Sequence, residues 1–130
     1  MAAYPTDRKY TKDHEWARIE GNQATVGITQ YAQESLGDVV FVELPKVGAE
    51  LKAGEQFGVV ESTKAVSELF APVSGKVLAI NDGLVDKPES LVADPHGAAW
   101  MVKVELSQPA EVEKLLSADD YEKHVAAQGH

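Results

Sequence analysis

The sequence predicts a mainly β fold, with a short helix in its first half and helical pieces at its end. Chain breakers (Gly, Pro and Asn-Asp-Gly) recur at short intervals between residues 45 and 88, a spacing typical of a small β-sandwich or barrel. Residues 15–20 alternate charged and apolar side chains, as a half-buried strand does. A weak internal repeat favours two similar β-units packed face to face, since neither unit could bury its apolar face alone.

The first two elements are predicted to form a β-hairpin. After the strand at residues 15–20 comes Gly21-Asn22, which is a turn signal. Residues 24–28 then read as the returning strand, because β-branched residues with few charges fit a half-buried sheet.

A short helix and a third strand follow. Thr29 can accept a hydrogen bond from the first helical turn, so it is the predicted N-cap of a helix that ends at Leu36. Gly37 is the predicted C′ residue, where a glycine relieves the left-handed conformation. Residues 39–44 are rich in Val and Phe and predict a strand that Pro45 ends.

The middle of the chain is predicted to hold only short strands and turns. Pro45-x-x-Gly48 recurs as Pro72-x-x-Gly75, and residues 51–57 recur loosely as residues 85–91. The second offset is longer than the first, so the later copy is expected to carry an inserted loop. The two copies are the two predicted β-units, and the crossing hairpin between them would project from the fold.

The last part of the chain predicts a strand and two helical pieces. Residues 100–106 alternate apolar and charged side chains and form the last predicted strand. Pro109 suits the first position of a helix whose apolar residues through Leu116 share one face. Ser117 and Asp120 have the spacing of a capping box at the start of another helix.

Length and composition predict one globular domain over residues 1–130, with residues 1–10 and 126–130 expected to be loose. The 130 residues are 44% apolar and 25% charged, which is ordinary for a globular chain. No apolar run approaches the roughly 20 residues that span a membrane, and the start has no apolar signal-peptide region. A bacterial cytoplasm is therefore expected, with a trimmed mitochondrial matrix protein as the alternative.

Charge and cysteine content exclude several functions. The net charge of −9 would repel phosphate backbones, so neither nucleic acid nor an anionic membrane is an expected partner. The chain has no cysteine, which excludes disulfides, thiolate zinc sites, iron–sulfur clusters and a cysteine nucleophile. The four histidines lack metal-ligand spacing, and His14 is predicted to be structural. Trp16 and Trp100 are predicted to lie in the core.

One lysine has an unusual setting. The segment Glu61-Ser62-Thr63-Lys64-Ala65 joins two strand-like runs, yet it contains no Gly, Pro or Asn to make the turn. Stiff, β-branched flanks would make the hairpin rigid, and the small, uncharged neighbours Thr63 and Ala65 would leave the Lys64 ammonium accessible. A fixed but exposed lysine is what a swinging-arm cofactor needs. The alternative is an ordinary solvated hairpin lysine.

Several motifs in order resemble the glycine cleavage system H protein family, which carries lipoate on a lysine. The similarity runs over nearly the whole chain and includes Trp100 and the helical end. The matching motifs are His14-Glu15-Trp16, Val26-Gly27-Ile28-Thr29, Ala32-Gln33, Leu36-Gly37, Val40-Phe41-Val42-Glu43-Leu44-Pro45, Gly58-x-Val60-Glu61-Ser62, the attachment motif Glu61-Ser62-x-Lys64-Ala65, and Ala71-Pro72-x-Ser74-Gly75.

The resemblance implies a fold and a non-catalytic carrier function. The fold would be the lipoyl-type barrel-sandwich hybrid with extra C-terminal helices. Lipoate would be amide-linked to Lys64 by a lipoate ligase or lipoyltransferase. The arm would take an aminomethyl group from a pyridoxal-phosphate glycine decarboxylase (the P protein) to an aminomethyltransferase (the T protein). A dihydrolipoamide dehydrogenase (the L protein) would reoxidise it.

Some positions leave the arm groove open to interpretation. Thr63 stands where valine is common in the family, and Ser35 stands where some members have a histidine in the helix thought to line the groove. Glu15 is a candidate groove residue by family likeness, with a solvated strand charge as the alternative. Glu61 and Glu68 either mark the hairpin for the lipoylating enzyme or are solubilising charges.

Three other functions remain as alternatives. One is an H-like protein that relays lipoyl groups to other enzymes, and another is a lipoyl domain of a different multienzyme complex. Biotinyl domains typically place Met on both sides of the lysine, where Thr63 and Ala65 stand here. The third alternative is a true enzyme, but the sequence contains no constellation of residues that supports one.

Overall fold

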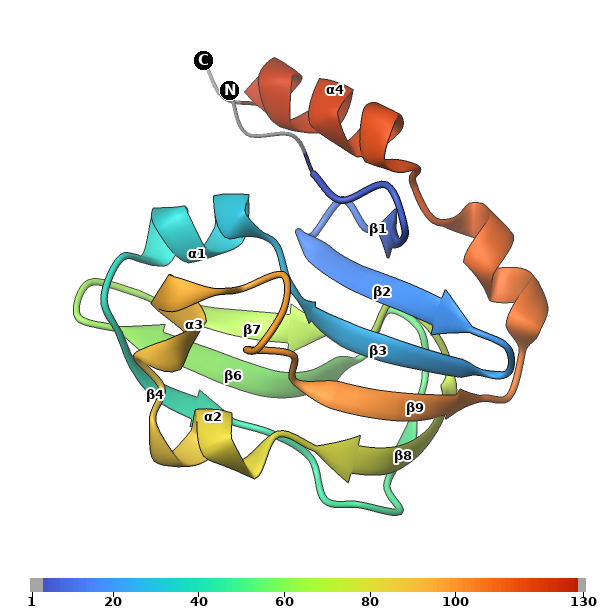
Figure 1. Ribbon diagram of the computed structural model, residues 1–130, viewed down its shortest axis with the longest axis horizontal. Coiled ribbons are helices and arrows are strands. Elements are labelled where there is room, and N and C mark those ends of the chain that lie inside the picture. The colour runs from blue at the N-terminus through green and yellow to red at the C-terminus, as the bar shows by residue number, and fades with distance from the viewer. Residues whose placement is uncertain (1–3, 129–130) are drawn as a thin grey trace.

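The computed structural model describes residues 4–128 and contains two β-sheets (Figure 1). The six-stranded sheet has the order β1-β2-β3-β9-β8-β5, and the three-stranded sheet has the order β4-β6-β7. Every strand pair within the described residues is antiparallel. The strands are β1 (Lys9–Tyr10), β2 (Glu15–Glu20), β3 (Gln23–Ile28), β4 (Val39–Glu43), β5 (Glu50–Leu51), β6 (Gln56–Ser62), β7 (Val66–Phe70), β8 (Gly75–Ile80) and β9 (Val102–Leu106).

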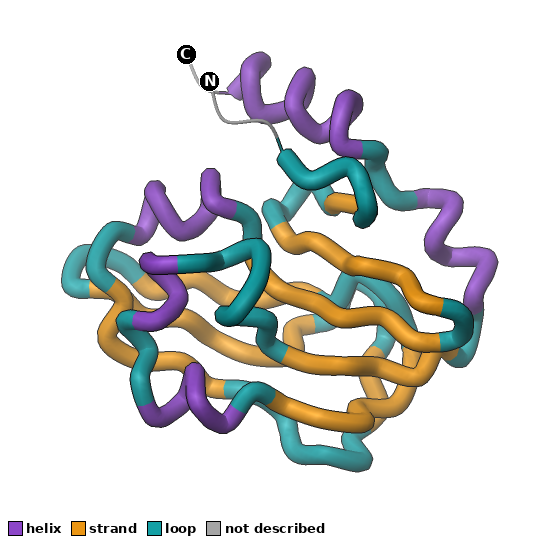
Figure 2. The backbone as a smooth tube through the Cα atoms, in the orientation of Figure 1, coloured by secondary structure: helices purple, strands orange, loops and turns teal. Residues whose placement is uncertain are grey.

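Figure 2 shows two sheets with the helices lying around them, which confirms the mainly β prediction. The helices are α1 (Gln30–Leu36), α2 (Asp82–Asp86), α3 (Ser90–Ala93), the 3₁₀ helix η1 (Pro109–Lys114) and α4 (Ala118–Gln128). No helix within residues 4–128 is long and apolar enough to cross a membrane.

The N-terminal hairpin and the first helix form as the sequence predicts. β2 pairs with β3 in register from Glu15 and Ile28 to Glu20 and Gln23, across a turn in which Gly21 has φ +62°. Thr29 caps α1, and its Oγ1 accepts a hydrogen bond from the Ala32 amide (3.3 Å).

The prediction that the middle of the chain holds only strands and turns is wrong for residues 82–93. This segment forms α2 and α3, whereas the similar residues 51–57 lie in β5, a turn and β6. Each helix is too short to be stable in isolation, so it depends on tertiary packing. Leu84 and Leu91 supply that packing, because both are almost fully buried in the main core.

The C-terminal segment differs from prediction in one element. The helix after Pro109 is a 3₁₀ helix that ends at Lys114, instead of continuing through Leu116. The reason is that the Leu116 backbone pairs with Tyr10: each amide donates to the other residue's carbonyl over 2.8 Å. Ser117 caps α4 as predicted, since its Oγ accepts from the Asp120 amide (3.2 Å).

Looseness of the chain ends stays a prediction, although parts of both ends lie in regular structure. Arg8 and Tyr10 are buried, and Tyr10 lies in β1. At the other end, residues 126–128 belong to α4. Residues 1–3 and 129–130 lie outside the described residues, so the expectation stays a prediction there.

Two hydrophobic clusters hold the fold together. The main cluster draws buried residues from both sheets and from α1, α2 and α3. The second cluster joins the N-terminal strands to α4 and contains Tyr10, Trp16, Ala118 and Tyr121. Trp16 is 1% exposed, which confirms it as a core residue, and Trp100 packs against the same cluster while half-buried.

Candidate functional site

Lys64 lies on the exposed turn between β6 and β7, at the same end of the molecule as α1 (Figure 1). The last paired residues before the turn are Glu61 and Val66, so four residues form the connection. Thr63, Lys64 and Ala65 are all exposed, which leaves the Lys64 ammonium open to a modifying enzyme. The structure therefore holds the candidate attachment lysine on a short strand-to-strand connection.

The Ser62 side chain stabilises the turn, which has no Gly, Pro or Asn. Its Oγ accepts hydrogen bonds from the amides of Lys64 (3.3 Å) and Ala65 (3.0 Å), and it donates to the Ala65 carbonyl (3.2 Å). The Ser62 amide also donates to that carbonyl (2.8 Å). A serine hydroxyl can bond nearby backbone groups in this way, so it replaces the missing Gly, Pro or Asn.

The loop between α1 and β4 contacts the turn from one side. The Thr63 amide donates a hydrogen bond to the Asp38 carbonyl (3.1 Å). The Lys64 side chain lies over Gly37, because a Cβ added to Gly37 would be 3.6 Å from Lys64 Cε and 4.0 Å from Nζ. The backbone on both sides of Lys64 is thus held by hydrogen bonds, while its side chain remains exposed.

Glu15 lies at the start of β2 and is 1% exposed, so its interpretation as a solvated strand charge is wrong. Its Oε1 accepts from Thr11 Oγ1 (2.7 Å), and its Oε2 accepts from the Phe70 amide (3.2 Å) at the end of β7. Burial raises the pKa of the Glu15 carboxyl to about 8, against the lowering effect of these two hydrogen bonds. Glu15 therefore connects the N-terminal loop to the strand that follows the lysine turn.

An open groove of about 430 Å³ lies beside the same strand. The N-terminal loop forms one wall and β7 the other, with the lining residues Lys12, Asp13, His14, Val66, Ser67, Glu68 and Phe70. The groove extends along the whole of β7, because Val66 and Phe70 are the first and last residues of that strand. The Phe70 amide donates a hydrogen bond to Glu15. No motif distinguishes Lys12, Asp13 or Ser67 from other surface polar residues, so the sequence alone does not predict them as groove residues.

His14 forms the rim of this groove in an unusual backbone conformation. Its φ is +72°, a region that non-glycine residues seldom occupy. Its Nδ1 lies 2.8 Å from the Tyr121 hydroxyl, which also lies 2.7 Å from Thr29 Oγ1. The Tyr31 ring packs against it with centroids 4.7 Å apart. α1 and α4 together thus fix the loop wall of the groove.

Ser35 lies on the exposed surface of α1 and does not line the groove that the structure contains. Its Oγ donates to the Tyr31 carbonyl (3.0 Å) within the same helix. A role for Ser35 in holding an arm stays a prediction. Glu68 does line the groove, and Glu61 is half-buried at the base of the lysine turn.

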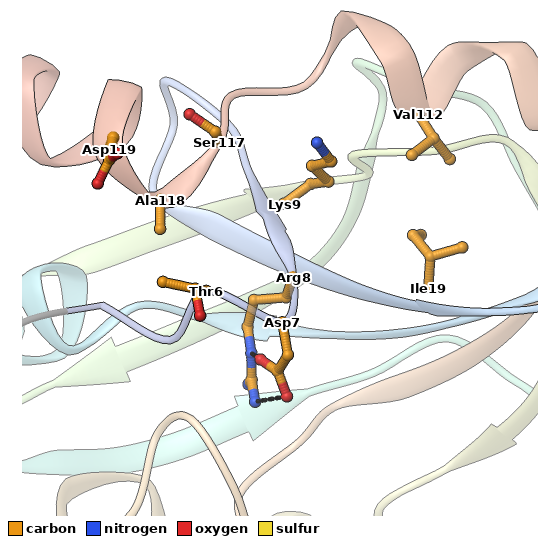
Figure 3. A pocket seen from close by; sticks show the side chains of 9 residues that line it. All are labelled: Thr6, Asp7, Arg8, Lys9, Ile19, Val112, Ser117, Ala118 and Asp119. Carbon is orange, nitrogen blue, oxygen red and sulfur yellow. Dashed lines mark hydrogen bonds and ion pairs between the residues drawn. The ribbon is translucent and has the colours of Figure 1, made fainter.

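A second hollow, of about 370 Å³, has no contact with the lysine turn. It lies between the N-terminal segment, β2 and the C-terminal helices, and none of its lining residues belongs to β6 or β7 (Figure 3). Arg8 within it donates to Asp7 (Nε to Oδ1, 2.8 Å) and to the His96 carbonyl (Nη1, 2.6 Å). Within residues 4–128, no group of His, Asp or Glu side chains could hold a metal ion.

Comparison with known proteins gives one consistent result. The family model described as "Glycine cleavage H-protein" matches residues 8–128. A glycine cleavage system H protein of Koribacter versatilis is 61% identical over 98% of this chain and 99% of its own. One of Carboxydothermus hydrogenoformans is 52% identical over 99% of both chains.

A solved structure agrees with these relatives. The crystal structure of a glycine cleavage system H protein from Mycobacterium marinum is similar with a TM-score of 0.85 and 44% identity. The structural similarity covers 98% of this chain and 100% of the Mycobacterium marinum chain. The family model, the relatives and the solved structure all span nearly the whole chain. This chain belongs to the glycine cleavage H-protein family.

Proposed function

We propose that this protein is the lipoyl carrier of a glycine cleavage system, with lipoate amide-linked to Nζ of Lys64. The observation that supports the proposal best is the lysine turn itself. Lys64 is exposed, yet hydrogen bonds to Ser62 and Asp38 fix the backbone beside it. An attached arm needs a free side chain on a fixed base, and the turn provides both.

The residues around Lys64 have distinct proposed roles. Ser62 shapes the turn, Thr63 ties it to the α1–β4 loop, and Ala65 leaves space beside the lysine. Glu61 places a carboxylate at the base of the turn, where a lipoate ligase or lipoyltransferase would meet it. These contacts present Nζ as the nucleophile for amide formation once it has lost its proton.

When attached to Lys64, lipoate would supply a disulfide that can accept an aminomethyl group and can be regenerated from the dithiol, with the P, T and L proteins as the partner enzymes for these reactions. This chain contributes attachment, presentation and recognition, and the hard chemistry belongs to the cofactors of the partner enzymes. A fixed anchor also raises the local concentration of the arm at each partner's active site.

We propose that the groove beside β7 shelters the loaded arm. The groove begins at Val66, two residues after Lys64, and the buried Glu15 lies behind it, bonded to Phe70. Residues 1–130 would act as a single carrier domain without catalytic activity of its own. The relatives named above come from bacteria, which supports a bacterial cytoplasm as the location.

The decisive experiment is intact mass measurement and peptide mapping after incubation with lipoate, ATP and a lipoate ligase. We expect one lipoyl-sized increment on Lys64 and none on the Lys64→Arg variant, which should keep the wild-type melting temperature. Lys52→Arg, a change at another exposed lysine, is the matched control and should be modified normally. Glycine cleavage by reconstituted Lys64→Arg, or an increment mapped to another residue, would contradict the proposed site.

A further inference from the structure

The outer face of the three-stranded sheet carries exposed apolar side chains beside the lysine turn. Val40 is 55% exposed, Phe41 45% and Val66 65%. These three residues are called the outer patch below. Such side chains are normally covered in a strand, so an exposed group of them next to a candidate modification site indicates an interaction surface.

The strand register places the outer patch on one face. Phe41 pairs with Glu61, and Glu61 pairs with Val66, so these side chains form a row across β4, β6 and β7. The next row contains Val42, Val60 and Ser67, and its two valines are buried. Because side chains alternate between faces along a strand, the row with Phe41 and Val66 points outward.

A β-bulge widens the patch. The register of β4 shifts between Val39 and Phe41, which leaves Val40 as an extra residue. A bulge re-aims side chains, so that the neighbouring residues Val40 and Phe41 are both exposed instead of alternating. This arrangement keeps two apolar side chains at the edge of the sheet, where β4 would otherwise present only one.

Carboxylates lie on one side of the outer patch and within its row. Glu43, Val59 and Glu68 form the outward row on the far side of the buried one, and Glu61 lies between Phe41 and Val66. Glu43 and Glu68 are exposed. Glu43, Glu61 and Glu68 are called the acidic rim. The surface therefore combines apolar and acidic side chains, which fits a partner with apolar side chains beside Lys or Arg.

The closeness of the outer patch to Lys64 indicates which kind of enzyme would bind it. Val66 is two residues from Lys64, and Phe41 lies across the same sheet end. An enzyme that acylates Nζ must bring its active site within the length of the lysine side chain, so its body has to cover the surface around the turn. Enzymes that act on the far end of an attached arm meet no such requirement.

We propose that the outer patch and its acidic rim form the docking surface for the enzyme that attaches the acyl group to Lys64, a partner with a basic, partly apolar face. This inference rests on the proposed function, because it concerns the same lysine. The patch positions the acceptor protein, and Lys64 alone reacts.

The test compares lipoylation kinetics of acceptor variants with a lipoate ligase. Val40→Thr/Phe41→Thr removes two apolar contacts of the outer patch while keeping residues that favour strands, and neither residue lines the groove beside β7. We expect the KM for the acceptor to rise about tenfold, as for truncated interface anchors, with kcat little changed. Val47→Thr/Leu78→Thr removes exposed apolar side chains elsewhere, 61% and 38% exposed, and should behave as wild type. Melting temperatures establish that every variant is folded.

The acidic rim gives a second readout. If the partner face is basic, the KM of the wild-type acceptor should rise with NaCl concentration, and Glu43→Gln should weaken that dependence. An unchanged KM for the Val40→Thr/Phe41→Thr variant would overturn the docking surface while leaving Lys64 as the attachment site. Failure to modify wild-type protein would instead overturn the proposed function itself.

A third readout separates this partner from the others. The variant would be lipoylated to completion and then assayed for glycine–bicarbonate exchange with a glycine decarboxylase. We expect exchange with a wild-type KM. Normal attachment combined with a raised KM in exchange would overturn the proposal, because the outer patch would then serve the decarboxylase.

Discussion

Glu15 carries a carboxyl group inside the protein, and its protonation couples folding to pH. The folded chain holds the proton up to a pKa of about 8, whereas the ordinary value is 4.5. Between these two values the folded state binds more protons than the unfolded state. The contribution of Glu15 therefore favours folding at low pH, and it is lost as pH rises from about 4.5 to about 8.

Glu15→Gln should remove this pH dependence. We expect the variant to gain stability relative to wild type as pH rises, reaching roughly a few kcal/mol above pH 8. Urea unfolding at pH 5, 7 and 9 would measure the difference. Glu113→Gln, at an exposed residue of η1, is the control and should track wild type at every pH. A constant offset between Glu15→Gln and wild type would contradict a raised pKa.

Gly37 is a second residue whose backbone matters. Its φ of +79° and ψ of −134° lie in a region that side chains disfavour. An added Cβ would meet Lys64 Cε at an ordinary contact distance of 3.6 Å, so the expected cost is in the backbone. Gly37→Ala should lower the free energy of unfolding by about 1–3 kcal/mol.

The matched control for Gly37 is Gly83→Ala in α2, at a glycine without a positive φ. Alanine there should be neutral or stabilising by up to about 1 kcal/mol, because it favours the helix. Thermal unfolding of both variants would measure the contrast. Equal effects at the two positions would show that the Gly37 conformation carries no strain.

At the scale of an element, the β6–β7 hairpin depends on one hydroxyl. Ser62→Ala would remove the acceptor for the Lys64 and Ala65 amides. We expect the rate of Lys64 lipoylation to fall about threefold to tenfold with little change in melting temperature, since the turn is exposed. Hydrogen exchange at the Lys64 and Ala65 amides should become faster.

Ser62→Thr keeps the hydroxyl and is the matched control for this hairpin prediction. It should restore slow amide exchange and near wild-type lipoylation. If Ser62→Ala exchanges its amides as slowly as wild type does, the side chain is not what holds the turn.

Local sequence patterns predicted the elements that are stabilised by residues close in sequence. The hairpin of β2 and β3, the Thr29 cap and the Ser117 cap all follow from residues close in sequence. The helices α2 and α3 did not, because long-range burial of Leu84 and Leu91 stabilises them. The end of η1 was likewise set by pairing with Tyr10, more than 100 residues away in the chain.

The candidate site also has one part that the local sequence predicts and another part that it does not. Lys64 and its motif are continuous in sequence, so pattern and family likeness were enough to single them out. The groove is assembled from residues 12–14 and β7, which are distant in sequence. Burial of Glu15 and the φ of His14 depend on that assembly, and no local pattern predicts either.

At the scale of the whole molecule, we propose that the chain unfolds as one cooperative unit. β2 belongs to both hydrophobic clusters, since Ala17 lies in the main cluster and Trp16 in the second. Neither cluster can lose this strand without disturbing the other. Trp fluorescence reports the second cluster, because Trp16 and Trp100 both pack there, and far-UV circular dichroism reports the sheets and helices.

The two signals should therefore change at the same temperature and urea concentration. Trp100→Phe would leave the buried Trp16 as the single tryptophan, and its fluorescence should give the same coincidence. A fluorescence transition that precedes the circular dichroism transition would mean that α4 and the N-terminal strands separate first.

The hydrogen bond from Thr63 to Asp38 has a consequence for how the chain can vary in length. Ser62 forms hydrogen bonds with residues that follow it in the turn, and Thr63 forms one with a separate loop. These bonds fix the position of each residue along the turn. One inserted or deleted residue between Glu61 and Val66 would break this registration and displace Lys64 from its base. Substitutions at Thr63 or Ala65 can be absorbed, but the number of residues in the turn cannot change.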